Sequence, residues 1–397
     1  MITDLLGIVI GRHTHEPRIE GGGKVMYEIA IMLAQLGIET YLIGFNYYNR
    51  LAKYVNNESS ERNLNLVNIS TRLLPQNVVL NTEAGALAAN LIESIKILNF
   101  LPKYKYELNK MKWRKVTKFI GNANKYTHKL LRMMERPVDV EEKRILVAFK
   151  KEELSPTRVR AIRPHTILVT SMENAYLAKN MYKDSIVVHA YPPIELSIYR
   201  PLKKERVCSG LFSMLGSDKL FLYFGRVNEL RFPTQMLQYI VTVLKEVDKE
   251  AKLLIVALPD INSRRWLKNS LELVKKKHLD NVLILSRVLN VWEKVLLLNC
   301  SKAFVFPSIE NTAIEPPITI LEAVACGTSI ITSGKSSSKE IAYMTNGYMF
   351  NDHLQLRKIF ERILLSRSDD PNRARSFAVK YLSTDAFRKK LLHIVED

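Results

Sequence analysis

Two stretches of sequence decide the fold, AFVFPS over residues 303–308 and EPPITILEAVACG over residues 315–327. The apolar run that opens the first stretch predicts a buried strand. The paired prolines in the second suit the start of a helix, because the first turn has no partner for the N–H that proline lacks. The closing glycine is placed to end that helix, and the run Ser329–Thr332 predicts the next strand. The segment is therefore predicted to be a strand–helix–strand unit.

Glu322 lies on the predicted helix, next to the edge of a parallel sheet at which ligands usually bind. A carboxylate there suits a sugar or a ribose, because its oxygens accept hydrogen bonds from two neighbouring hydroxyl groups. An ordinary strand–helix–strand unit with a solvated glutamate is the alternative that the local pattern leaves open.

The segment Leu321–Gly327, LEAVACG, resembles the signature Leu-Glu-Ala-Met-Ala-x-Gly of the retaining, nucleotide-sugar-dependent glycosyltransferases of family 4, which have the GT-B fold. The resemblance implies that Glu322 holds the donor, at its ribose. The family has another glutamate eight residues earlier, where this sequence has Ile314. Glu310 and Glu315 flank that position, and either carboxylate can take the role of orienting the sugar ring.

A pair of arginines precedes the signature. Gly225 and Arg226 follow the predicted strand Leu220–Phe224, and Arg231 lies five residues after Arg226. In the family, an arginine and a lysine at these positions hold the donor diphosphate. Two cations in a dry site stabilise the charge that builds on a departing nucleoside diphosphate, and arginine is the more rigid choice. Phe232 replaces a glycine of the family and is expected to narrow the donor site.

The resemblance assigns further donor contacts. Glycines let a backbone approach a phosphate closely, and the family has a Gly-Gly between its first strand and first helix. This sequence has glycines at 21–23 in that place, although a simple tight turn is the alternative. The donor contacts implied in this way are Gly22, Gly23, Gly225, Val288, Ile320 and Leu321.

The resemblance also implies the reaction. A retaining glycosyltransferase would move a sugar from a UDP- or GDP-sugar to an acceptor hydroxyl of a glycan, a lipid-linked glycan or a protein. The leaving phosphate serves as the base in this chemistry, so no protein group is named as the general base. No carboxylate triad or cluster of His and Cys suggests a metal site, and because the family as a rule needs no metal, no cofactor is expected. Two other functions stay open because several motif positions differ. One is a catalytically silent GT-B-like protein that binds sugar nucleotides, and the other is a nucleotide-sugar epimerase of the same fold.

Apolar runs of strand length alternate with helical patterns along most of the chain, which predicts an α/β fold. The resemblance implies two Rossmann-like, doubly wound domains that face each other across a cleft. An acceptor domain is expected over residues 1–200, a donor domain over 201–376, and a helix that returns to the first domain over 377–397. Residues 56–163 are expected to be less regular, with a helix over 86–100 and a basic, aromatic-containing insertion over 101–136.

The formal net charge of +19 implies an anionic partner. Residues 101–136 hold eleven lysines and arginines against two glutamates, with aromatic residues such as Trp113 and Phe119 among them. Cations beside aromatic rings suit the surface of an anionic membrane. A pair of solvated helices with inward-facing aromatics is the alternative. No nucleic-acid partner is expected, because no recognisable binding module accompanies the charge.

Composition limits the class of protein. The 397 residues are 47% hydrophobic and 25% charged, which is typical of a folded globular protein. Because the sequence has no run of eighteen uncharged apolar residues, no membrane-spanning helix is expected. The first residues lack a basic region before the short apolar run, so they are not expected to be a signal peptide. Cys208, Cys300 and Cys326 lie far apart without metal-ligand spacing and are expected to be reduced thiols. These features predict a cytoplasmic protein, and the basic segment over residues 101–136 adds the expectation of peripheral attachment to a membrane.

Overall fold

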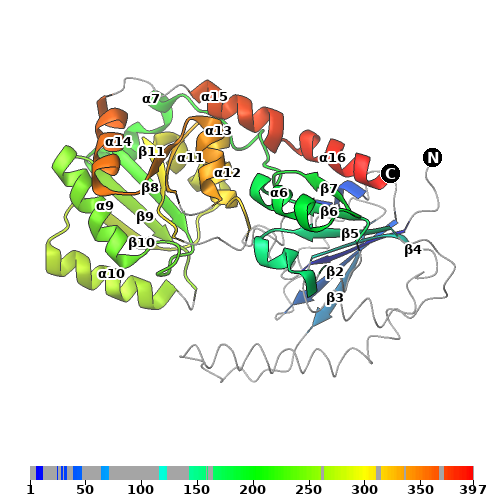
Figure 1. Cartoon of the computed structure of the whole chain (residues 1–397). Helices are drawn as coiled ribbons and strands as arrows, with labels where there is room; N and C mark the ends of the chain where they lie inside the picture. The colour runs from blue at the N-terminus through cyan, green and yellow to red at the C-terminus, as the bar shows by residue number, and fades with distance from the viewer. Residues whose placement is uncertain are drawn as a thin grey trace. The chain divides into compact units, whose positions relative to one another are not determined.

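The computed structural model describes residues 6–11, 25, 28–29, 31–33, 39–46, 64–70, 116–122, 143–157, 159, 164–260, 263–309, 314–334, 337–365 and 371–396. They form two compact units, each built on one parallel sheet. Unit 1 comprises residues 1–169, 174–189 and 390–397, and unit 2 comprises residues 170–173 and 190–389. Two parallel sheets with helices between their strands confirm the predicted α/β class and the two Rossmann-like domains (Figure 1).

Unit 1 contains a seven-stranded sheet with the order β3-β2-β1-β4-β5-β6-β7, in which neighbouring strands are parallel. Its strands are β1 (Leu6–Gly11), β2 (Glu39–Asn46), β3 (Leu64–Ser70), β4 (Val116–Asn122), β5 (Lys143–Ala148), β6 (Thr166–Val169) and β7 (Ile186–His189). The described helices near these strands are η2 (Lys151–Leu154) and α6 (Met172–Met181). Ile29 and Leu33, which follow the glycines at 21–23, are helical and buried, and their spacing of four residues puts them on one face of a helix.

Strands β3, β4 and β5 correct the expectation of irregular structure over residues 56–163. β4 pairs with β1 on one side and β5 on the other, so residues 116–122 form a central strand of the sheet and not part of a helix. Its sequence VTKFIGN interrupts the apolar residues with a lysine, which hid the strand from the sequence pattern. The rest of the basic segment and the helix predicted over 86–100 lie outside the described residues. Within the described part of the chain, every helix is too short or too polar to cross a bilayer.

Unit 2 contains a six-stranded sheet with the order β10-β9-β8-β11-β12-β13. Its strands are β8 (Leu220–Gly225), β9 (Lys252–Ala257), β10 (Val282–Ser286), β11 (Ala303–Phe306), β12 (Ser329–Ser333) and β13 (Tyr348–Phe350). Helices α9, α10 and α14 lie on one side of this sheet and α11, α12 and α13 on the other (Figure 1). The pattern confirms the doubly wound arrangement.

The helices of unit 2 start with the short pair α7 (Lys204–Val207) and α8 (Ser209–Leu215). Those that follow are α9 (Thr234–Val247), α10 (Ser263–Lys277), α11 (Val291–Cys300), α12 (Ile318–Ala325), α13 (Ser338–Thr345), α14 (His353–Leu365), α15 (Pro371–Phe377) and η3 (Ala378–Leu382). The last helix, α16 (Thr384–Glu396), begins in unit 2, and its residues from 390 onward belong to unit 1. The last helical stretch, predicted as continuous, breaks at Ser383, whose backbone is extended.

The strand order of unit 2 reverses between β8 and β11. From β8 the chain builds outward to β10, then returns to β11 beside β8 and builds toward β13. Such a reversal leaves a crevice at the carboxyl ends of the two central strands, and ligands of open α/β sheets bind there. The loops that follow β8 and β11 hold Arg226 and the segment before α12, so the topology places both at this point.

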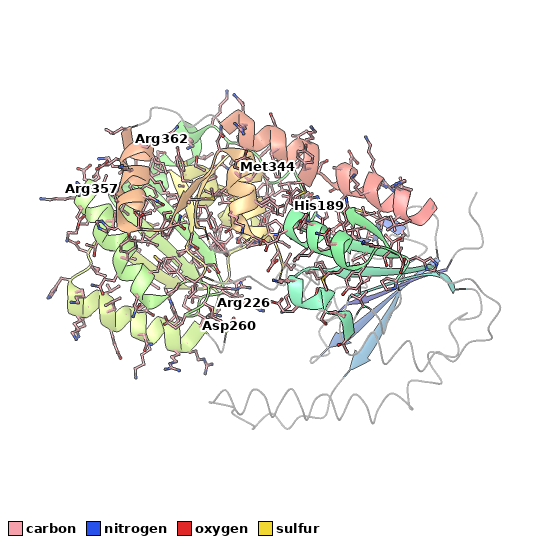
Figure 2. The ribbon with its side chains drawn as sticks, viewed as in Figure 1. His189, Arg226, Asp260, Met344, Arg357 and Arg362 are labelled. Atoms are coloured by element: carbon pink, nitrogen blue, oxygen red, sulfur yellow. A yellow bond between two sulfur atoms is a disulfide. The ribbon has the colours of Figure 1, made fainter. Side chains whose placement is uncertain are left out.

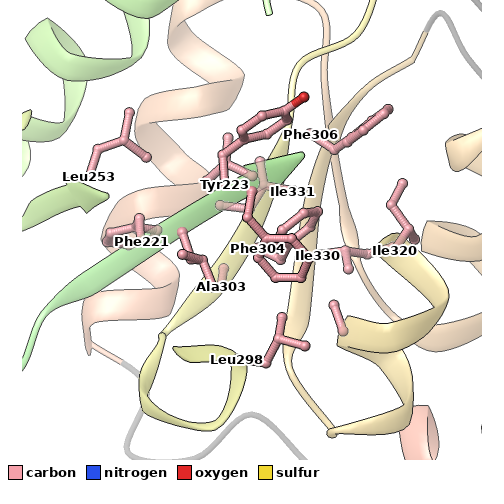
Figure 3. Packing of buried hydrophobic residues seen from close by; sticks show 14 of the residues in the cluster. Phe221, Tyr223, Leu253, Leu298, Ala303, Phe304, Phe306, Ile320, Ile330 and Ile331 are labelled. Carbon is pink, nitrogen blue, oxygen red and sulfur yellow. The ribbon is translucent and has the colours of Figure 1, made fainter. Parts of the chain in front are cut away.

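Aromatic and branched side chains fill the core under this point (Figure 3). The ring of Phe304 packs against two rings of β8. Its centroid lies 5.1 Å from that of Phe224 and 6.1 Å from that of Tyr223. Ile320 of α12 belongs to the same cluster and is fully buried. Each such side chain contributes roughly 1.5–3 kcal/mol by leaving water, so the base of the site is rigid.

A disulfide joins Cys208, at the start of α8, to Cys300, at the end of α11. The expectation of reduced thiols is therefore wrong for these two residues. They are 92 residues apart in sequence, and only the packing of α11 beside the α7–α8 segment brings their Cα atoms to 5.4 Å. Cys326 is a free, buried thiol.

Candidate functional site

The end of β8 is shaped by Gly225 and Tyr223. Gly225 has a φ of 132°, in a region that favours glycine, so this residue is required by the backbone turn. The Tyr223 hydroxyl donates to the carbonyl of Arg226 over 2.5 Å. Burial raises the pKa of Tyr223 to about 12, so the phenol keeps its proton and this hydrogen bond at neutral pH. Arg226 is thus held directly after the strand.

The loop after β8 is fixed to the loop after β11. The Asn228 side chain accepts hydrogen bonds from the backbone N–H groups of Leu230 and Arg231, over 3.0 and 2.8 Å. The carbonyl of Leu230 accepts from the N–H of Ile309 over 3.0 Å and from the Ser308 hydroxyl over 3.3 Å. The backbone that carries Arg231 is therefore set against the start of the β11 loop.

Arg226 and Arg231 lie in one charged cluster with Asp260. The Arg226 Nε is 3.5 Å from Asp260 Oδ2, and Figure 2 shows the two residues beside each other. Asp260 also accepts the N–H of Ser263, over 2.7 Å, at the start of α10. Burial lowers the pKa of Arg231, the charge of Arg226 acts in the same direction, and Tyr223 and Asp260 oppose them. The structure thus brings the two predicted arginines together and adds an aspartate that the sequence analysis missed.

Phe232 does not narrow a donor site. The residue is fully buried, and its ring centroid lies 4.8 Å from that of Tyr223 and 5.8 Å from that of Trp266. The Trp266 indole N–H donates to the Phe232 carbonyl. The expectation is wrong because this side chain turns into the core beneath the arginine loop.

The first turn of α12 faces the end of β8. A Cβ added to Gly225 would lie 3.9 Å from the Thr319 methyl group. Ile320 and Leu321 are fully buried, and their N–H groups donate to the Pro317 carbonyl over 3.0 and 3.3 Å, so neither predicted donor contact is accessible. The N–H groups before them, on Ile318 and Thr319, belong to the turn for which a helix supplies no acceptor, at its positive end.

Glu322 is engaged by residues of unit 2. Its Oε1 accepts a hydrogen bond from the Tyr199 hydroxyl over 2.7 Å, and Lys294 Nζ lies 3.2 and 3.3 Å from its two oxygens. The same ammonium lies 5.6 Å from the centroid of the Phe224 ring. Glu322 is 3% exposed, so its carboxylate is largely closed to solvent.

The remaining predicted site residues differ in their exposure, and three of them lie outside the described residues. Glu315 is fully buried, and its carbonyl accepts the Thr170 hydroxyl over 2.6 Å. Val288, after β10, is 52% exposed. Glu310, Gly22 and Gly23 lie outside the described residues. The roles proposed for these five residues stay predictions.

Sequence reasoning also missed Lys294 and Tyr199. Lys294 occupies a position of the stripe that Val291, Val295 and Leu298 define at helical spacing on α11. A lysine in an apolar stripe usually has a buried anionic partner, so this signal was available. Tyr199 lies in the proline-rich segment before α7 and offered no such signal.

Comparison with models of known protein families gives a match that lies within unit 2. Residues 218–365 match the profile of the family described as Glycosyl transferases group 1. This segment contains both arginines, Asp260, Lys294 and Glu322. No curated protein sequence matches the chain.

Solved structures resemble the whole chain at low sequence identity. Anabaena Alr3699/HepE in complex with UDP has a TM-score of 0.70 at 11% identity, over 99% of both chains. A glycosyltransferase from Rickettsia africae ESF-5 has a TM-score of 0.68 at 15% identity, over 99% of this chain and 98% of that one. The sucrose-phosphate synthase of Thermosynechococcus elongatus has a TM-score of 0.66 at 15% identity, over 98% and 94%. The fold is that of the GT-B glycosyltransferases.

Proposed function

We propose that this protein is a retaining glycosyltransferase that moves a sugar from a UDP- or GDP-sugar to an acceptor hydroxyl. One observation carries the proposal. At the reversal of strand order in unit 2, two clustered arginines and the first turn of α12 meet inside the segment that matches the glycosyltransferase profile. The UDP complex of the similarly folded Anabaena protein supports a nucleoside diphosphate as the ligand.

The arrangement suits a leaving diphosphate. Arg226 and Arg231 offer N–H groups in planar forks that match phosphate oxygens, and the positive end of α12 adds backbone N–H groups. Arg231 is partly buried, so its charge acts through a medium of lower dielectric constant than water. Both features favour the state in which negative charge has moved from the sugar to the phosphate. Attack on the face that the diphosphate leaves, with a phosphate oxygen accepting the acceptor's proton, would give retention.

A direct experiment separates this reaction from the alternatives. The purified chain is incubated with a panel of UDP- and GDP-sugars and candidate acceptors, and products are identified by mass spectrometry and by NMR of the anomeric proton. A transferase produces nucleoside diphosphate and an α- or β-linked product of the donor's own configuration. An epimerase would change the sugar without needing an acceptor, and a silent binding protein would bind the nucleotide without turnover.

Activity is expected to persist in excess EDTA. The two arginines supply the positive charge that a divalent cation provides in metal-dependent transferases. The measurement compares initial rates in EDTA with rates in Mg²⁺ or Mn²⁺. Strict dependence on either ion would contradict this prediction, because a metal would then stabilise the leaving diphosphate and the arginines would contribute less.

Asp260→Asn is expected to tighten binding of UDP or GDP by about 3- to 10-fold, because it removes a negative charge beside both arginines. The asparagine side-chain oxygen can still accept the Ser263 N–H at the start of α10, so stability should change little. Titration calorimetry on the variant and on wild type measures the difference. Weaker binding by the variant would mean that Asp260 acts chiefly by orienting Arg226.

The proposal includes an acceptor held near an anionic membrane, because the net charge of +19 exceeds what solubility needs. Each cation near such a surface contributes about 1 kcal/mol, so a few together suffice for reversible attachment. The chain is expected to sediment with vesicles that contain anionic lipid and to dissociate as salt rises. Equally weak binding to neutral and anionic vesicles would contradict the proposed attachment to an anionic membrane.

A further inference from the structure

Helix α10 presents a basic face on the surface of unit 2. Its buried residues are Ser263, Trp266 and Ser270, which define the side that packs against the unit. The basic side chains of the helix are all exposed: Arg264, Arg265, Lys268, Lys275, Lys276 and Lys277. Glu272 is the one acidic residue of α10. Six cations against one carboxylate give this helix a net charge of +5.

The stability of the helix explains only part of this charge. The three lysines of the last turn suit the negative end of the helix dipole. Arg264 and Arg265 lie in the first turn, where the backbone is positive, and no acidic residue in that turn offsets them. Among the residues that the structure describes, Lys268 forms an ion pair with Glu272 over 4.0 Å, and the other five cations of α10 form none. Most of the charge is therefore left for a partner outside the helix.

Three of the cations form a row along the helix. Arg264, Lys268 and Lys275 are spaced by four and seven residues, so they lie on the same side of α10 and span about 16 Å of its length. Leu271 lies beside this row and is 53% exposed. Figure 2 shows the long side chains of α10 extending away from the sheet. Cations beside an exposed apolar side chain suit the surface of a bilayer, where headgroups meet the charges and the apolar group reaches the hydrocarbon boundary.

The orientation of α10 is fixed by contacts on its inner side. The Trp266 indole N–H donates to the Phe232 carbonyl, and Asp260 accepts the N–H of Ser263 over 2.7 Å. A helix held in this way loses little entropy when its outer face meets a partner. Because Trp266 is the one aromatic residue of α10 and is 1% exposed, the basic face has no ring on which a nucleic-acid base could stack. The face therefore fits an anionic membrane better than a nucleic acid.

We propose that the outer face of α10 is the surface with which unit 2 binds an anionic phospholipid bilayer. The cations of the helix lie over the headgroups, and Leu271 contacts the hydrocarbon boundary. This inference rests on the proposed function, in which the acceptor is held near an anionic membrane. It assigns that attachment to a described helix of unit 2, which the sequence pattern did not single out, in addition to the basic segment over residues 101–136.

The first test is co-sedimentation of the full chain with vesicles of phosphatidylcholine alone and of equal parts of phosphatidylcholine and phosphatidylglycerol. The triple variant Arg264→Gln/Lys268→Gln/Lys275→Gln is expected to bind the anionic vesicles about 100-fold more weakly than wild type, since each cation at the surface contributes about fivefold. The control variant removes the same charge from exposed positions on α14, α15 and α16: Lys358→Gln/Arg373→Gln/Lys389→Gln. It should bind within about threefold of wild type, because salt screens charges that do not reach the surface.

A fluorescent probe tests direct contact at α10. Leu271→Cys is labelled with an environment-sensitive dye, whose emission should shift to the blue and rise on addition of the anionic vesicles. The same dye on Leu365→Cys, at an 82% exposed position of α14, is the control and should not respond. Cys326 is buried, so wild type treated with the dye gives the background labelling.

The proposal is overturned if the α10 variant binds anionic vesicles as well as the control variant does, or if the probe at position 271 stays silent while wild type binds. It is also overturned if the α10 variant keeps its vesicle binding but loses binding to a single-stranded RNA oligonucleotide, since the face would then serve a nucleic acid. Sugar transfer to a soluble acceptor without vesicles is measured separately. Its absence would reject the proposed function and leave the vesicle result standing, so the two failures are distinguishable.

Discussion

Replacing Arg226 by alanine is expected to lower kcat about 100- to 1000-fold, equivalent to about 3–4 kcal/mol of transition-state stabilisation. The guanidinium is placed directly after β8 by Gly225 and the Tyr223 hydrogen bond, where it would meet the charge of the leaving diphosphate. Arg226→Lys keeps the charge but loses the bidentate geometry, so it should be intermediate. Initial rates with a competent donor and acceptor measure both effects.

Arg357→Ala is the matched control for this prediction. Arg357 also pairs with a carboxylate in unit 2, Glu361, over 3.0 Å, but it lies on α14 and outside the candidate site. Its loss should leave kcat within about twofold of wild type, as for other exposed ion pairs. Equal turnover of Arg226→Ala and wild type would show that the arginine cluster has no part in catalysis.

Removing the disulfide with Cys208→Ser/Cys300→Ser is expected to lower the free energy of unfolding by about 4 kcal/mol. The bond closes a loop of 92 residues, and such a cross-link restricts the unfolded chain strongly. Denaturant titration of wild type, with and without reductant, and of the double variant measures the loss. The unfolding midpoint of wild type should fall on reduction, while that of the double variant should not move.

Thiol counting gives an independent check. Under denaturing conditions without reductant, alkylation should modify one of the three cysteines, Cys326, and all three after reduction. Modification of all three before reduction would show that the disulfide is absent, and the expected stability loss would then disappear as well.

Local sequence patterns predicted unit 2 well because its strands are short apolar runs and its helices have clear stops. Gly327 ends α12 with a φ of 73°, and the runs before it became β11 and α12 as expected. Unit 1 was harder. β4 is central in its sheet but carries Lys118 among apolar residues, so its pattern resembled a polar segment. A strand's place in the middle of a sheet is decided by neighbours that a local pattern does not include.

The candidate site was predicted where the contacts are near in sequence and missed where they are distant. Arg226 and Arg231 share one loop, and both were identified. The partners of Glu322 come from 28 and 123 residues away, and the disulfide from 92. A resemblance over Leu321–Gly327 identifies the residue but not what surrounds its carboxylate.

The crystal structure of the chain with UDP or GDP tests the central claim most directly. The account predicts that the diphosphate lies at the carboxyl ends of β8 and β11, with phosphate oxygens within hydrogen-bond distance of the Arg226 and Arg231 guanidinium groups and the first turn of α12. A nucleotide bound elsewhere on the chain, with Arg226 still paired with Asp260, would contradict it.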